Sequence, residues 1–256
     1  IVGPVTLIKL CKLNGDYVSS ESDINKLLDV ILPLYQQVFT ELQQAGVNWV
    51  QLDEPTLVKL EDEAGVAPYR RVVEALREAA PSLNIELQTY FDSIDPYQAV
   101  TQLPVQAIGL DFVHGHGENL AHVREFGFPK DKVLAAGVID GHNVWTADLS
   151  KKLQLVRELQ DAASELWIQP SNTLLHVPIT TKYETAAGPE LLGGLAFADE
   201  KLQEIVTLTQ TLNGQDTRAA LAKNTAALKA LNESKARNNA SVQTAIKHLG
   251  DTVFER

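Results

Sequence analysis

The stretch that decides the fold is Trp49-Val50-Gln51-Leu52-Asp53-Glu54-Pro55. Its apolar residues predict a buried strand that ends in two adjacent carboxylates and a proline. Parallel α/β proteins place their chemistry at strand ends of this kind. Successive side chains of a strand point to opposite faces, so only one of Asp53 and Glu54 can face the interior of a barrel. That carboxylate would bind a substrate amine or act as a base, or else cap a neighbouring loop or pair with Arg70 or Arg71.

Apolar runs alternate with segments of helical periodicity along most of the chain. Because strands separated by helices pair in parallel, the pattern predicts an α/β fold with a parallel sheet. The runs are nearly all apolar, which is typical of strands buried on both faces. We expect Pro33 to kink or restart the first long helix, and the tail over 217–249 to be wholly helical. The six strands that we predict are 5–10, 47–53, 85–91, 107–113, 132–139 and 166–169.

Two architectures fit this order, an open doubly wound sheet and a (β/α)8 TIM barrel. The sequence has no Gly-x-Gly-x-x-Gly turn and no P-loop, which weakens the nucleotide-binding open sheet. Polar groups at the ends of successive strands favour the barrel, because they would line a single mouth. They are Asp53, Glu54, Tyr90, Asp92, Asp111, His114, Asp140, Ser171 and Asn172.

A closed barrel needs eight strands, and an open arc of six would expose two edges. We therefore predict that residues 1–213 form a barrel that lacks its first two strands, with the third to the eighth in this chain. Residues 214–256 would form a helical extension.

Composition limits the possible partners and compartments. The formal net charge of −11 argues against nucleic acid, because phosphate binding needs clustered Lys and Arg. The single cysteine, Cys11, excludes an internal disulfide and is expected to be a buried thiol beside a strand. No apolar run approaches the roughly 18 residues of a membrane span, and nothing resembles a signal peptide. These features predict a cytoplasmic protein without a membrane partner.

The histidines and one tryptophan are further candidates for a site. His114 and His116 would share one face of a strand and could bind zinc, but Gly115 favours a loop in which that geometry is lost. His142 and His176 each follow a predicted strand and would either bind a ligand or make structural hydrogen bonds. Trp145 would stack on a flat ring system or cover the core.

The strand ends also resemble, in their order, those of cobalamin-independent methionine synthase. The similarity covers nearly the whole chain. The matching phrases are Gly3-Pro4-Val5-Thr6, Trp49-Val50-Gln51-Leu52-Asp53-Glu54-Pro55, Thr89-Tyr90-Phe91, Leu110-Asp111-Phe112-Val113-His114-Gly115, Ala136-Gly137-Val138-Ile139-Asp140-Gly141-His142-Asn143-Val144-Trp145 and Leu174-Leu175-His176-Val177-Pro178.

The resemblance implies a role in methionine biosynthesis. Members of that family are 5-methyltetrahydropteroyltriglutamate–homocysteine S-methyltransferases, which transfer a methyl group from 5-methyltetrahydrofolate polyglutamate to homocysteine. They consist of two similar (β/α)8 barrels. The C-terminal barrel holds a catalytic zinc on one His, two Cys and one Glu. The N-terminal barrel, which this chain resembles, lacks the zinc and helps to hold the folate tail.

The zinc-ligand positions of the catalytic barrel correspond here to Gln88, Tyr90, Asp111 and Asn172. The resemblance therefore implies no metal and no catalytic residue in this chain. Asp53 stands where the catalytic barrel binds substrate. We expect Asp53, together with Trp145 and His176, to contact substrate.

The resemblance thus implies a non-catalytic N-terminal barrel that is a scaffold and part of the folate site, and that is inactive alone. Its partners would be the zinc-bearing C-terminal barrel of the same polypeptide and the folate. The alternative is a self-standing metal-dependent TIM-barrel enzyme. Its ligands would be Asp53, Asp111, His114, His116 and Asp140.

Overall fold

The computed structural model describes residues 1–13, 15–235 and 237–249, which form two compact units. The first unit comprises Ile1–His142 and Gln154–Thr173, and the second comprises Asn143–Leu153 and the residues from Leu174 on. The expected boundary between residues 213 and 214 falls inside the second unit, so that boundary stays a prediction.

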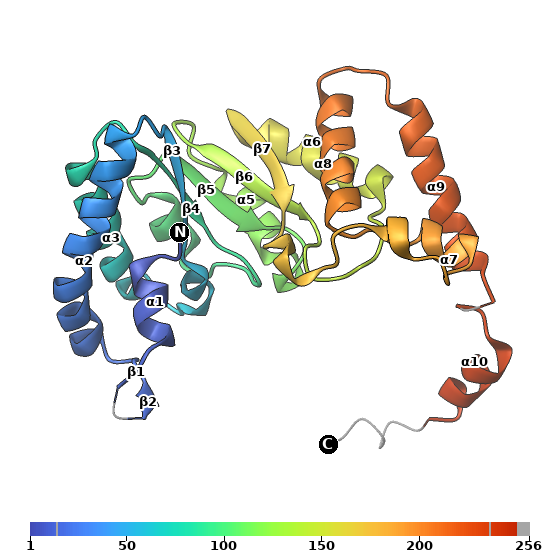
Figure 1. Cartoon of the computed structure of the whole chain (residues 1–256), viewed down its shortest axis with the longest axis horizontal. Coiled ribbons are helices and arrows are strands. Elements are labelled where there is room, and N and C mark those ends of the chain that lie inside the picture. The colour runs from blue at the N-terminus through green and yellow to red at the C-terminus, as the bar shows by residue number, and fades with distance from the viewer. Residues whose placement is uncertain (14, 236, 250–256) are drawn as a thin grey trace. The chain divides into compact units, whose positions relative to one another are not determined.

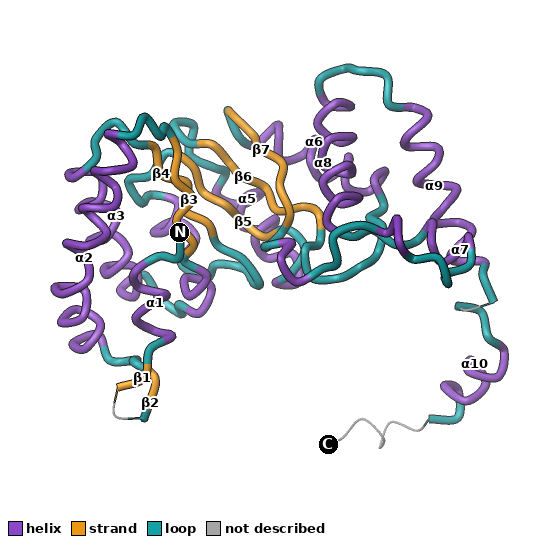
Figure 2. Tube along the Cα trace, in the orientation of Figure 1, coloured by secondary structure: helices purple, strands orange, loops and turns teal. Residues whose placement is uncertain are grey.

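A five-strand parallel sheet forms the centre of the first unit and confirms the predicted α/β class. Figure 2 shows the strands side by side, in the order of the chain. Among the described residues no pairing between the first and the last of the five closes the sheet. The strands are β3 (Trp49–Asp53), β4 (Asn84–Gln88), β5 (Ala107–Asp111), β6 (Val133–Ile139) and β7 (Glu165–Pro170).

The strand predicted over 5–10 is wrong, because these residues form helix α1 (Pro4–Leu10). Pro4 starts the helix, since its ring fixes a helical φ and its missing N–H is not needed in the first turn. The extended segment lies just before it. Val2 forms a parallel bridge with Asp53, and Ile1 bonds to Gln51 and Asp53 through its backbone.

Strands β5 and β6 are buried on both faces, as expected, whereas β3 and β7 are only partly buried. Along the strands, one face is apolar and the other carries the larger polar side chains. Val50 and Leu52 are buried on one face of β3, while Gln51 and Asp53 point to the other. Cross-strand register carries this alternation through the sheet. The large and polar residues of the second face are Trp49, Gln51, Asp53, Glu86, Gln88, Asp111, Trp167 and Gln169.

The sheet curls strongly about its polar face. Gln169 Nε2 on β7 donates to Gln88 Oε1 on β4 over 2.7 Å, although two strands lie between them. Gly109 on β5 permits this contact, because a Cβ there would come within 1.9 Å of Gln88 Oε1. Small residues in the middle strands thus let long polar side chains meet above them.

Helices connect the strands of the first unit (Figure 1). Helix α2 continues through Pro33, and the Ser20 hydroxyl caps it by accepting from Asp23 N at 3.1 Å. Cys11 is exposed beside the small β1–β2 hairpin, so the buried thiol was a wrong prediction. The helices and hairpin strands are α2 (Glu21–Gln44), α3 (Ala67–Ala79), α4 (Tyr97–Thr101), α5 (Glu118–Phe126), α6 (Leu149–Ala162), β1 (Lys12–Leu13) and β2 (Asp16–Tyr17).

The second unit contains the start of α6 and the helices of the C-terminal third. The tail is not wholly helical: Ser234 ends α9 and Asn239 caps α10 through its side chain. No helix in the described part of the chain combines the length and apolarity needed to cross a membrane. The helices are α7 (Pro189–Gly193), α8 (Ala198–Leu212), α9 (Arg218–Glu233) and α10 (Ala240–Lys247). Short 3-10 turns in the two units are Pro55–Lys59, Ala64–Val66, Gly115–Gly117, Leu174–His176 and Thr181–Tyr183.

Candidate functional site

The predicted strand-end residues of the first unit lie along one edge of the sheet, because parallel strands end at the same edge. Asp111 is the most deeply buried carboxylate there, with no exposed surface. It accepts hydrogen bonds from the backbone N–H groups of Phe91, Val113 and His114 at 2.8 to 3.0 Å. Its Oδ2 also lies 2.8 Å from His114 Nδ1. Both oxygens of Asp111 are therefore used to hold two loops.

One of those loops contains a strained residue. Phe91 has a φ of 82°, which is unfavourable for a bulky side chain, and its N–H donates to Asp111 Oδ2. Its ring meets that of Tyr90 edge to face at 4.7 Å. Burial, with smaller contributions from the charges of Asp53 and Glu54, raises the pKa of Tyr90 to about 12. The phenol is thus neutral at pH 7.

Of the four residues that correspond to zinc ligands in the family resemblance, the remaining two, Gln88 and Asn172, are amides. Gln88 donates to the Thr89 carbonyl at 2.8 Å and accepts from Gln169, while Asn172 donates to the Ser171 hydroxyl at 3.3 Å. Two amides, a neutral phenol and a fully bonded carboxylate do not fit zinc, which prefers thiolate and imidazole ligands. In the ranges described, no three His, Cys, Asp or Glu side chains form a group suited to a metal ion. The absence of metal from this chain stays a prediction.

Asp53 and Glu54 face opposite sides of β3, as the alternation predicted. Glu54 is 1% exposed and caps α1, accepting from Val5 N at 3.0 Å and Thr6 N at 2.7 Å. It therefore has the structural role of a cap. Asp53 is half-buried on the polar face and accepts from Gln51 Nε2 at 2.7 Å.

Arg71 pairs with Asp29 and not with Asp53 or Glu54. The alternative in which Arg71 pairs with a strand-end carboxylate is therefore wrong. Asp53 therefore lies on the polar face without an ion pair to Arg71.

Glu86 was missed by the sequence analysis. It lies beside Gln51 on the polar face, and its Oε1 is buried with no hydrogen-bond partner among the described residues. Burial and then the charge of Asp53 raise the pKa of Glu86 to about 7. The feature of the sequence that could have pointed to Glu86 is a single acidic residue between apolar neighbours, in Ile85-Glu86-Leu87.

The two histidines of the proposed metal pair lie in a loop, as Gly115 suggested. His116 is exposed with a φ of 52°, while His114 is bonded to Asp111. The His114 ring meets that of His142 edge to face, with the ring centroids 6.4 Å apart. The ligand set of the alternative metal enzyme does not come together as a group of three or more in the described residues.

The candidates Trp145 and His176 belong to the second unit, whereas Asp53 belongs to the first. The Arg237 guanidinium lies 5.6 Å from the Trp145 ring centroid, and the Trp145 carbonyl accepts from Lys201 Nζ at 3.2 Å. His176 is exposed at the end of a 3-10 turn. The joint role of Asp53, Trp145 and His176 in substrate binding stays a prediction.

Comparison with known proteins shows the family to which the chain belongs. The chain is 55% identical over its whole length to a 5-methyltetrahydropteroyltriglutamate–homocysteine methyltransferase of Lactiplantibacillus plantarum, covering 34% of that protein. It is 47% identical to the protein of the same name from Listeria monocytogenes, covering 33% of it. The chain thus spans about a third of the length of these curated relatives.

A solved structure is similar in fold. It is a B12-independent methionine synthase from Shewanella sp. W3-18-1 in complex with selenomethionine, with a TM-score of 0.54 and 15% identity. The similarity covers 84% of this chain and 62% of that one. A model of the N-terminal domain of the cobalamin-independent synthase matches residues 1–164, well over half of the chain. This chain therefore belongs to the family of cobalamin-independent synthase N-terminal domains.

Proposed function

We propose that this chain is part of the non-catalytic N-terminal barrel of a cobalamin-independent methionine synthase. The whole protein transfers a methyl group from 5-methyltetrahydrofolate polyglutamate to homocysteine. The names of the relatives support this activity, and the chain spans only about a third of their length. The observation that carries the non-catalytic role is the donor set at the strand ends.

That donor set offers a homocysteine thiol no activation. A free thiol has a pKa of about 8.5, so little thiolate exists at neutral pH unless a metal or a cation stabilises it. Gln88 and Asn172 are neutral amides, and the oxygens of Asp111 are already bonded. Methyl transfer therefore depends on the C-terminal barrel of the same polypeptide, which carries the zinc.

In the whole protein, the strands of this chain would belong to a closed (β/α)8 barrel. The curl of the sheet, with Gln88 and Gln169 in contact across it, supports closure. The extended backbone of residues 1–3 pairs with β3 in parallel and so continues the order of the sheet. Two strands before Ile1 would complete the barrel, and residues 214–256 would form the helical extension towards the catalytic barrel.

We assign this chain the roles of scaffold and wall of the folate site, in a cytoplasmic enzyme. Asp53 is the strongest of the three substrate contacts, because its carboxylate is half-buried on the polar face, where Gln51 Nε2 donates to its Oδ1. Trp145 offers a partly exposed ring, and His176 an exposed imidazole.

The test compares methionine formation by the whole protein, by its C-terminal barrel and by this chain, each with added zinc. We expect activity in the whole protein and none in this chain. Methionine formation by this chain with zinc alone would overturn the non-catalytic role.

Binding of 5-methyltetrahydrofolate triglutamate by the whole protein tests the folate wall. We expect Asp53→Asn to weaken it by about tenfold. The matched control is Asp161→Asn on the exposed side of α6, which should leave binding unchanged.

A further inference from the structure

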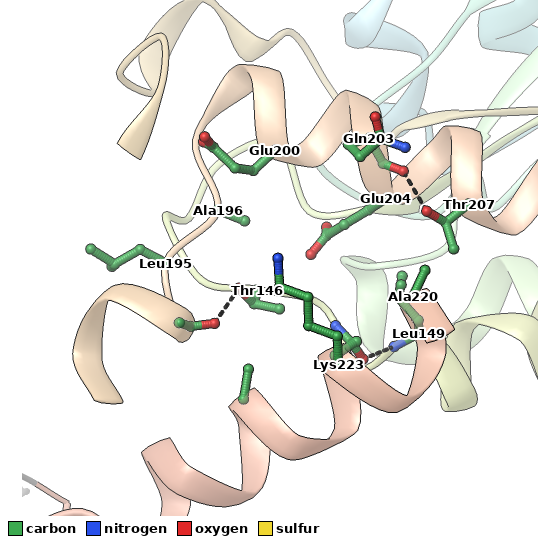
Figure 3. Close-up of a pocket in the computed structure, with 13 residues that line it drawn as sticks. Thr146, Leu149, Leu195, Ala196, Glu200, Gln203, Glu204, Thr207, Ala220 and Lys223 are labelled. Carbon is green, nitrogen blue, oxygen red and sulfur yellow. Dashed lines mark hydrogen bonds between the residues drawn. The ribbon is translucent and has the colours of Figure 1, made fainter. Parts of the chain in front are cut away.

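A cavity of about 270 Å³ lies wholly within the second unit and plays no part in the proposed function. Its walls come from α8, α9 and the segments around Thr146 and Leu195 (Figure 3). Much of the lining is apolar. The apolar residues are Leu149, Leu195, Ala196, Ala220 and Ala227.

A buried carboxylate points into this cavity from α8. Glu204 is only 7% exposed, and its Oε1 accepts from Ala147 N at 2.8 Å. Its Oε2 is buried and has no hydrogen-bond partner among the residues that the structure describes. A buried acceptor without a partner is unfavourable, so a donor from a ligand would be stabilised here.

A positive charge faces the same space from α9. Lys223 lines the cavity, and in Figure 3 its ammonium end points inward, towards the carboxylate of Glu204. The ion pairs formed among the described residues do not include one between Lys223 and Glu204. The cavity thus presents an acceptor and a cation on opposite walls.

Two further polar residues of the wall are already engaged. Glu200 accepts from the backbone of Thr181 and Phe197, and Asn224 bonds to the backbone of residues 147 and 149. These bonds hold the wall in place. Lys201 on α8 is also buried; its Nζ donates to Asn143 and to the Trp145 carbonyl, and its positive charge acts on Glu204 as well.

We propose that this cavity binds a small free amino acid with an apolar side chain. Its ammonium group would donate to Glu204 Oε2 and its carboxylate would meet Lys223. The side chain would lie against Leu195 and Ala220. A zwitterion suits both walls, because a carboxylate alone would leave Glu204 Oε2 without a donor and an amine alone would leave Lys223 without an anionic partner. The volume suits an amino acid and is below that of sites for drug-sized ligands.

Three matched probes test this site: L-leucine, isoamylamine, which lacks its carboxylate, and 4-methylpentanoate, which lacks its amine. They are titrated into the whole protein that contains this chain, and hydrogen exchange is followed at the amides of residues 143–149 and 198–227. We expect saturable protection by L-leucine and binding about tenfold weaker for the other two. This local readout separates the cavity from any amino-acid site elsewhere in the protein.

The variant Lys223→Met should weaken L-leucine binding by about tenfold. Lys229→Met is the matched control, because Lys229 lies on the same helix outside the cavity lining. Glu204→Gln should weaken binding too, and Lys223→Met keeps the test valid if that variant is poorly folded.

Two results would overturn the proposal. One is unchanged exchange with L-leucine at about 10 mM, which corresponds to affinity too weak to matter. The other is equal binding of isoamylamine and L-leucine together with no effect of Lys223→Met.

Discussion

The indole rings of Trp49 and Trp167 meet edge to face, with centroids 4.7 Å apart. The two residues belong to β3 and β7, the first and last strands of the five-strand sheet. A flat sheet would keep strands four positions apart at roughly 19 Å. The contact therefore shows that the sheet bends round its polar face until side chains of its two outer strands touch.

Removing both rings should show that they stabilise this curl together. We expect a coupling of about 0.5–1.5 kcal/mol between Trp49→Leu and Trp167→Leu in a double-mutant cycle measured by urea unfolding. Trp145→Leu, in the other unit, is the control and should be additive with Trp49→Leu. If the effects of Trp49→Leu and Trp167→Leu on the free energy of unfolding are additive, the contact between the two rings does not stabilise the fold.

Gly3→Ala should destabilise the first unit by roughly 1–3 kcal/mol, because the new Cβ would lie 2.2 Å from Glu54 Cδ. The displaced carboxylate would lose its bonds to the start of α1. The measurement is the free energy of unfolding in urea. Gly188→Ala is the matched control, since no atom lies within 4 Å of its Cβ position. A similar loss at both positions would contradict the steric argument.

Asp111→Asn should lower the free energy of unfolding by about 1–3 kcal/mol, because an amide cannot accept from every donor that surrounds this side chain. We also expect faster hydrogen exchange at the Phe91, Val113 and His114 amides. Asp95→Asn, on the exposed loop before α4, is the control and should change neither quantity. Unchanged exchange at these three amides in Asp111→Asn would refute the anchoring role.

Glu86 should make the protein less stable as the pH rises. Its native pKa of about 7 lies above the ordinary value of 4.5, so the native state binds the extra proton between these values. The stabilisation is complete below pH 4.5 and is lost as the pH rises through 7. Glu86→Gln imitates the protonated form, and should be close to the parent at pH 5 and about 2 kcal/mol more stable at pH 8.

Urea unfolding at the two pH values measures this difference. Glu63→Gln, at an exposed carboxylate, should show the same small change at both. If the stability of Glu86→Gln follows the pH in the same way as the parent, Glu86 is not the titrating group.

The central strands could be predicted from sequence because their signal is local and strong. The runs around Val50, Leu87, Ile108 and Leu134 are apolar and bounded by polar residues, and all became parallel strands. Their ends could be predicted to share an edge from topology alone. The roles of those ends could not. Whether Asp111 binds a ligand or holds loops depends on backbone donors that are separated from it by up to 20 residues.

The errors have physical causes. The run after Pro4 is β-branched, but Pro4 favours the first turn of a helix and Glu54, far along the chain, caps it. Glu86 was overlooked because a strand pattern does not show which face is polar until the register is known. The cavity around Glu204 is formed by segments more than 50 residues apart, which no local pattern reveals.

The bonds of Asp111 also limit how readily this edge of the sheet could acquire metal chemistry. The substitutions Gln88→His, Tyr90→Cys and Asn172→Cys would supply the donor types that zinc prefers, yet Asp111 would still be committed to its loops. A metal would have to compete with those amides, and its gain would be offset as Phe91 lost its anchor. These three substitutions would therefore not be enough, and the loops would have to be redesigned first. The gain of a metal site at this edge of the sheet is in this sense a problem of loop design more than of ligand choice.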